Sequence, residues 1–142
     1  MKILVPDQKI AVFSTVVPMR WGDMDAYGHL NNATYLRLFE EARVQWLAAS
    51  GHPLVTDNQG PVVANIFCNF YREINYPCQV RINLFVSEPG RTSNDCFMTM
   101  TDAEQPDVLY ADGGAAMVWV DFGKKKPTAL PQWYLALVDR AR

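Results

Sequence analysis

The sequence predicts an α+β fold in which one long helix packs against a run of antiparallel strands. One stretch, residues 33–50, carries a wide apolar stripe at helical spacing, and four later segments alternate apolar and polar residues. With 142 residues, 49% of them hydrophobic and 20% charged, the chain has the length and composition of one globular domain spanning 1–142. One helix against consecutive antiparallel strands is a two-layer α+β arrangement.

The first two predicted elements are a strand and the long helix. Residues 9–20 alternate with apolar side chains on both faces, and Pro18 stands near the end of this segment. They predict a strand that is largely covered on both sides. In the helix that follows, Asn32 is expected to be the N-cap and Gly51 the residue that ends it. The helix is apolar enough for a curved sheet to wrap around it.

Four alternating segments follow the helix, and turn residues separate them. The predicted strands are residues 62–71, 79–87, 95–101 and 108–121. In the last strand, Gly113 and Gly114 indicate either a bulge or a close approach of a neighbouring backbone. The Lys124–Lys126 run predicts a solvated turn, and residues 131–142 predict a short terminal helix.

Composition excludes several classes of partner and compartment. The net charge of −2 offers no electrostatic footprint for nucleic acid, and no apolar run approaches the length of a membrane span. The N-terminal apolar segment is too short, and is followed too soon by a charged residue, to be expected as a signal peptide. The odd number of cysteines without a C-x-x-C pair argues against disulfides and against a metal site, so a cytoplasmic location is expected. The three free thiols belong to Cys68, Cys78 and Cys96.

The segment 20–32 holds the densest group of polar side chains and leads directly into the predicted helix. It places Asp23, Asp25 and His29 just before the helix start. Carboxylates and an imidazole can activate water, and N–H groups at a helix N-terminus can stabilise an oxyanion. The sequence therefore predicts a catalytic site at this point of the chain.

Each of these residues also has a structural interpretation. Asp23 and Asp25 would point to opposite sides of an extended segment, so only one would face a pocket. Alternatively, both carboxylates bond local N–H groups of the turn. His29 is compatible with a general base, an orienting group or a packed turn residue.

A second candidate site is the loop after the Pro-Gly turn at 89–90. Arg91, Thr92 and Ser93 combine a cation with two hydroxyl groups, a combination that can hold phosphate. The alternative is an ordinary surface loop.

The motif from Asp23 to Tyr35 resembles the hotdog-fold thioesterases. The nearer relatives are the 4-hydroxybenzoyl-CoA thioesterase-like acyl-CoA thioesterases, and the D-x-D-x-x-G-H-x-N-N form also resembles acyl-carrier-protein thioesterases. The resemblance extends over nearly the whole chain, including the segments 70–74 and 118–131. It implies a long central helix wrapped by a five- or six-stranded antiparallel sheet.

The resemblance also implies a site and an assembly. Asp25 would be the catalytic carboxylate, with His29 beside it, and the backbone N–H near Asn32 would meet the thioester oxygen. Tyr35 would contact substrate, and the loop Arg91–Ser93 would bind the phosphates of coenzyme A. No metal and no cofactor beyond the coenzyme A of the substrate are expected.

Self-association is expected for two reasons. Relatives in the family form homodimers edge to edge, or homotetramers, with active sites between subunits. Independently, the strands at 62–71 and 108–121 are long and apolar on both faces. Edge strands of this kind are normally covered or paired, so we expect another subunit to cover them. Three functions remain open: hydrolysis of acyl-CoA or acyl-carrier-protein thioesters, non-catalytic acyl-CoA binding, and a hotdog hydratase or dehydratase activity.

Overall fold

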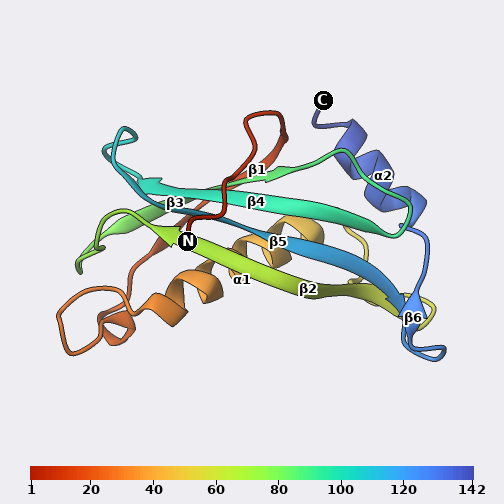
Figure 1. Ribbon diagram of the computed structural model, residues 1–142, viewed down its shortest axis with the longest axis horizontal. Helices are drawn as coiled ribbons and strands as arrows, with labels where there is room; N and C mark the ends of the chain where they lie inside the picture. The colour runs from red at the N-terminus through yellow and green to blue at the C-terminus, as the bar shows by residue number, and fades with distance from the viewer.

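The computed structural model describes residues 1–142 as one antiparallel sheet with a long helix across one face (Figure 1). The strand order is β1-β3-β4-β5-β2, so β1 and β2 are the edges, and a short β6 pairs with the end of β5. The strands are β1 (Ile10–Pro18), β2 (Gln59–Phe70), β3 (Gln79–Val86), β4 (Ser93–Asp102), β5 (Leu109–Asp121) and β6 (Lys126–Pro127). The helices are α1 (Asn32–Ala48), α2 (Gln132–Asp139) and a 3-10 turn, η1 (Trp21–Asp23).

The long helix is confirmed, but its N-cap is one residue earlier than expected. The side chain of Asn31 accepts a hydrogen bond from the Ala33 N–H at 2.9 Å, so Asn31 is the cap and Asn32 is the first helical residue. Both asparagines are plausible caps in sequence, and only the backbone decides between them. At the other end Gly51 has a φ of +81°, the left-handed conformation that ends helices.

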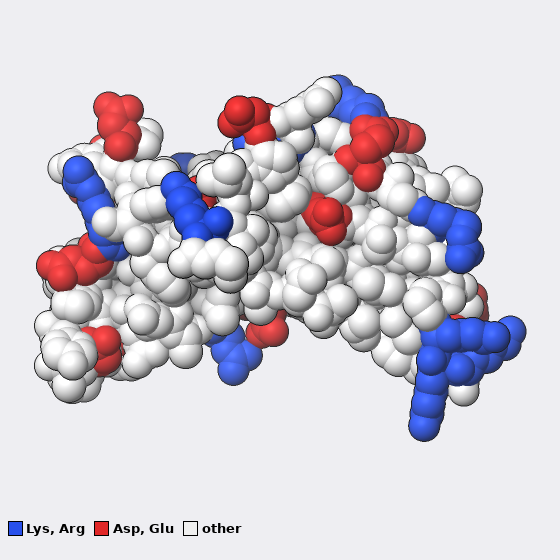
Figure 2. Space-filling model, in the orientation of Figure 1, with Lys and Arg blue, Asp and Glu red and all other residues white.

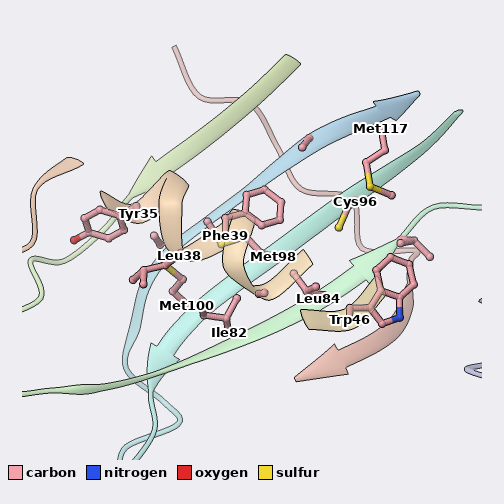
Figure 3. Packing of buried hydrophobic residues seen from close by; sticks show 14 of the residues in the cluster. Tyr35, Leu38, Phe39, Trp46, Ile82, Leu84, Cys96, Met98, Met100 and Met117 are labelled. Carbon is pink, nitrogen blue, oxygen red and sulfur yellow. The ribbon is translucent and has the colours of Figure 1, made fainter. Parts of the chain in front are cut away.

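The core lies between α1 and the sheet. Inward-facing residues of α1, led by Phe39 and Trp46, pack against the inward-facing residues of β3 and β4 (Figure 3). Because alternate strand residues point to opposite faces, every second residue of β3 and β4 points to the face of the sheet that the helices cover. The fully buried residues of these two strands are Val80, Ile82, Leu84, Val86, Cys96, Met98 and Met100. The predicted central helix on an antiparallel sheet is therefore confirmed.

The two strands expected at the edges have different positions. β2 is an edge strand with exposed apolar side chains, including Val63 at 44% and Ile66 at 37% of full exposure. β5 lies between β4 and β2, so the expectation that residues 108–121 form an edge is wrong. Its apolar character on both faces reflects a position in the middle of the sheet.

Gly113 marks a close approach of two backbones. A Cβ atom on Gly113 would lie 2.3 Å from the Phe67 carbonyl oxygen of the neighbouring strand β2. The alternative expectation of a bulge at this glycine is wrong, because the β2–β5 pairing is regular there and shifts register between Val63 and Asn65. The glycine is thus required by the spacing of the strands.

Several boundaries differ from the sequence-based expectation, and two of the differences turn expected loop or turn residues into strand. Ser93 begins β4 and does not belong to a loop, and Lys126 and Pro127 form the two-residue strand β6 where only a turn was expected. No helix is long and apolar enough to cross a membrane. All three cysteines are free thiols.

Candidate active site

A tight loop carries Asp25 and His29 to the start of α1. Gly28 has a φ of +84°, which lets the chain reverse, and Met24 then pairs with Leu30 as an isolated bridge. The Asp25 N–H donates to the His29 carbonyl at 2.9 Å. The two predicted catalytic residues are therefore fixed relative to each other through the backbone.

The two aspartates have different partners. The Asp23 carboxylate accepts from the Arg20 N–H at 2.9 Å and lies 3.3 Å from the Arg20 guanidinium. The Asp25 carboxylate accepts from the Tyr27 N–H at 2.9 Å and takes part in no ion pair. The expected extended segment is wrong, because Asp23 ends the 3-10 turn η1, so alternation does not explain the difference. The Asp23 carboxylate is therefore paired with Arg20, whereas the Asp25 carboxylate has no basic side chain as a partner.

A surface pocket of about 230 Å³ lies beside the start of α1. It brings together three of the predicted site residues, which are His29, Asn32 and Tyr35. The remaining lining residues are Leu30, Phe70, Tyr71, Arg72 and Glu73. Asp25 is not part of this lining within one chain and lies in the loop that supports His29.

Tyr35 forms the buried wall of this pocket. Its hydroxyl donates to the Arg72 carbonyl at 3.4 Å, and its ring packs edge-on against Phe70 with centroids 4.8 Å apart. Burial, followed by the nearby Cys68 thiol and smaller charge effects that include Asp25, raises the pKa of Tyr35 to about 12. The phenol therefore stays neutral near neutral pH and remains a hydrogen-bond donor.

The start of α1 offers a free backbone donor at Asn32, a residue that lines the pocket. The Ala33 N–H and the Thr34 N–H are both taken by Asn31, through its side chain and its carbonyl. Asn32 is the first helical residue, so its N–H has no partner within the helix, and it makes no other hydrogen bond in the chain. A carbonyl oxygen that gains negative charge would find this donor and the positive end of the helix dipole together.

Sequence reasoning missed Arg72 and Glu73 as lining residues. The Leu30 N–H donates to the Ile74 carbonyl at 2.8 Å, which brings the segment after β2 against the loop that holds Asp25 and His29. As a result the Glu73 carboxylate lies 3.1 Å from the His29 Nε2 atom. The two residues are 44 positions apart in sequence, and no local pattern links them.

The predicted phosphate site is not in the pocket of the same chain. Arg91 and Thr92 are tied through their carbonyls to Leu130 and Trp119, and Ser93 pairs with Val118 of β5. The pocket lies at the other end of β5, where Ala111 pairs with Phe70. Seven residues of strand separate Ala111 from Val118, or about 23 Å at roughly 3.3 Å per residue.

The site and the fold together define a class of enzyme. A long helix on a six-stranded antiparallel sheet, with a polar loop at the helix start, is the hotdog arrangement of thioester hydrolases. Residues 19–138 match the family model of the thioesterase-like superfamily. The chain belongs to this superfamily, which confirms the resemblance and the predicted class of enzyme.

Solved structures of similar proteins agree with this assignment. The PA2801 protein of Pseudomonas aeruginosa, a proposed thioesterase, is 32% identical, with a TM-score of 0.84 and coverage of 89% of this chain and 97% of that chain. A proposed acyl-CoA thioesterase of Xanthomonas campestris is 34% identical, with a TM-score of 0.76 and coverage of 84% and 99%. The uncharacterized protein YsmA of Bacillus subtilis is 26% identical over 125 residues, which cover 80% of this chain and 83% of YsmA.

A more distant structure shares the fold alone. Slr0204, a 1,4-dihydroxy-2-naphthoyl-CoA thioesterase from Synechocystis, is 18% identical, with a TM-score of 0.83 and coverage of 89% of this chain and 95% of that chain.

Proposed function

We propose that this protein is a single thioesterase domain, residues 1–142, that hydrolyses acyl-CoA thioesters to free acid and coenzyme A. The observation that carries the proposal is the unpaired Asn32 N–H at the start of α1, beside the loop that holds Asp25 and His29. In the proposed reaction this N–H stabilises the thioester oxygen as it becomes negative. No metal and no cofactor other than the coenzyme A of the substrate takes part.

Asp25 supplies the carboxylate in this proposal. It acts either as a general base that takes a proton from water or as a nucleophile that forms an anhydride with the acyl group. In the first route the C–O bond forms as the carboxylate takes the proton, and the C–S bond then breaks to release the thiol. The absence of an ion pair at Asp25 leaves its carboxylate free for either role.

The proposed active unit is a homodimer formed through β2. A two-fold axis pairs an edge strand antiparallel with its own copy, so the Gln59 end of one β2 lies beside the Phe70 end of the other. The exposed apolar residues Val63 and Ile66 would then be covered. A dimer of two such dimers would keep this pairing and would have to use another surface.

This pairing would supply the phosphate contacts from the partner. Arg91, Thr92 and Ser93 lie at the Gln59 end of the sheet, as does the Lys124–Lys126 run beside β6. Figure 2 shows Lys and Arg side chains gathered at the end of the molecule where Figure 1 draws β6. In the dimer this basic end would approach the partner's pocket, where coenzyme A enters.

A charge on the β2 edge should break the dimer. Val63→Lys places an ammonium group where an apolar side chain would be buried, so sedimentation should change from a dimer to a species near 16.1 kDa. Val16→Lys is the matched control, because Val16 is 38% exposed on the opposite edge β1. If the dimer persists with Val63→Lys and dissociates with Val16→Lys, the interface lies at β1.

Arg91→Ala should raise KM for acyl-CoA several-fold with little change in kcat. A contact to a distant phosphate is equally strong in the ground state and in the transition state, so it affects binding alone. The matched substrate is the same acyl group on pantetheine, which lacks the nucleotide, and its KM should not change. Equal KM values for wild type and Arg91→Ala with acyl-CoA would place the phosphate site elsewhere.

Mixed dimers test whether Arg91 acts across the interface. Two differently tagged chains, one Asp25→Asn and one Arg91→Ala, are co-expressed and the mixed dimer is purified. If Arg91 acts on the partner's pocket, the pocket with intact Asp25 also receives an intact Arg91, and the mixed dimer should hydrolyse acyl-CoA with the wild-type KM. A KM as high as that of the Arg91→Ala homodimer would show that Arg91 acts within its own chain.

Release of free thiol from a panel of acyl-CoA and acyl-carrier-protein thioesters, measured with DTNB, tests the proposed reaction. A protein that only binds acyl-CoA would release no thiol. A hydratase would consume an enoyl-CoA substrate by adding water, again without thiol release. Turnover of carrier-protein esters in preference to CoA esters would replace the proposed substrate while retaining the reaction.

A further inference from the structure

We propose that Glu73 is a positioning residue for hydrolysis, which acts by orienting the His29 imidazole toward the attacking water. The inference rests on the proposed function and extends it to a residue from a distant part of the chain. Its basis is the 3.1 Å contact between the Glu73 carboxylate and His29 Nε2 inside the pocket.

The backbone places Glu73 beside His29, because the residues that follow them are bonded to each other. Leu30 and Ile74, the residues that follow His29 and Glu73, are joined by a 2.8 Å hydrogen bond and are both almost completely buried. The His29 ring also stacks on Tyr27, with the two planes 20° apart. The imidazole is therefore held on one face by an aromatic ring and at one nitrogen by a carboxylate.

A carboxylate 3.1 Å from Nε2 favours a proton on that nitrogen. An ionised carboxylate can only accept, so it favours the imidazole tautomer with the proton on Nε2. The other nitrogen, Nδ1, then has a free lone pair, and it makes no hydrogen bond within the chain. A water that donates one proton to Nδ1 would have its oxygen oriented for attack on a thioester bound at the Asn32 N–H.

Proton transfer in this arrangement remains with Asp25. As the water oxygen bonds to the acyl carbon, the second water proton passes to the Asp25 carboxylate, and the His29–water hydrogen bond holds the geometry. When the C–S bond breaks, the departing sulfur recovers that proton and leaves as the thiol. In the anhydride route Asp25 attacks the acyl carbon and expels the thiolate, and the water held by His29 then attacks the acyl carbon of the anhydride. The Asp25 carboxylate leaves and one water proton passes through it to the thiolate, so free acid and thiol are formed and His29 and Glu73 keep the same function.

A purely structural role for Glu73 would change the stability of the protein and not the rate of hydrolysis. The His29 and Glu73 side chains are 34% and 58% exposed, and ion pairs at such positions contribute little to stability. Glu73→Ala should therefore leave the unfolding temperature nearly unchanged. The orienting role instead predicts a lower kcat, with KM unchanged, because the attacking water is positioned only for the chemical step.

The test is a double-mutant cycle on thioester hydrolysis with His29→Ala, Glu73→Ala and the double variant. Glu73→Ala should lower kcat about tenfold with KM within about twofold, and Glu73→Gln, which keeps an oxygen acceptor, should recover part of this loss. In the His29→Ala background Glu73→Ala should have no further effect, since its action passes through His29. Asp139→Ala removes an exposed carboxylate at the end of α2 that pairs with Arg142, and it should leave kcat unchanged.

Two outcomes would overturn the proposal. Wild-type kcat in Glu73→Ala would show that the contact has no role in hydrolysis, and an additive loss in the double variant would show that Glu73 acts independently of His29. If Glu73→Ala unfolds, the comparison of Glu73→Gln with wild type decides in the same way. These results are distinct from failure of the proposed function, which would appear as no thiol release by the wild-type protein.

Discussion

Asp25→Asn should lower kcat for acyl-CoA hydrolysis by roughly 10²–10⁴-fold, the range expected for loss of a general base or nucleophile. This corresponds to about 3–5 kcal/mol of activation free energy. Folding should survive, because the asparagine Oδ1 atom can still accept the hydrogen bond from the Tyr27 N–H that Asp25 accepts at 2.9 Å. Thiol release with DTNB measures turnover, and thermal unfolding measures the fold.

Asp23→Asn is the matched control, because both residues are aspartates of the same loop. Asp23 is bonded to Arg20 through both the backbone and the guanidinium, so its replacement should weaken the loop. The expected result is a lower unfolding temperature or a higher KM, with kcat much closer to wild type than in Asp25→Asn. Near-wild-type hydrolysis by a folded Asp25→Asn variant would disprove the proposed mechanism.

The main elements of the fold could be predicted because their patterns are local. The apolar stripe of residues 33–50 and the alternation in the later strands each need only a short window of sequence. The order of strands across the sheet depends on long-range pairing. The apolar pattern of residues 108–121 therefore predicts an edge strand, although β5 lies between β4 and β2. The strand β6 was missed because two residues are too few for a periodic pattern.

The same difference between local and long-range patterns applies to the residues of the candidate site. Asp25, His29 and Asn32 lie within eight residues of each other, so their sequence alone indicated a shared role. The Leu30–Ile74 backbone hydrogen bond brings Glu73 to His29, and no local sequence pattern predicts this pairing. Arg91 was expected at the site from its chemistry, yet within one chain it lies at the far end of the sheet. In the proposed dimer, a second subunit would bring Arg91 near the pocket of its partner.

Gly113→Ala should lower the free energy of unfolding by about 1–3 kcal/mol, as expected for overpacking in a close-packed region. The new methyl group would lie 2.3 Å from the Phe67 carbonyl oxygen and 3.2 Å from the Met98 side chain. A backbone oxygen cannot rotate away as a side chain can, so β2 and β5 must separate locally. Because β2 is also the proposed dimer edge, the distortion should weaken dimerisation as well.

Gly22→Ala is the control for this substitution. A Cβ atom on Gly22 would meet no atom within 4 Å, and Gly22 does not have a positive φ, so the variant should unfold at nearly the wild-type urea concentration. Urea titrations of both variants, at equal protein concentration, give the two free energies directly. Equal midpoints for Gly113→Ala and Gly22→Ala would mean that β2 and β5 can move apart without cost, and the close strand spacing would then not explain the glycine.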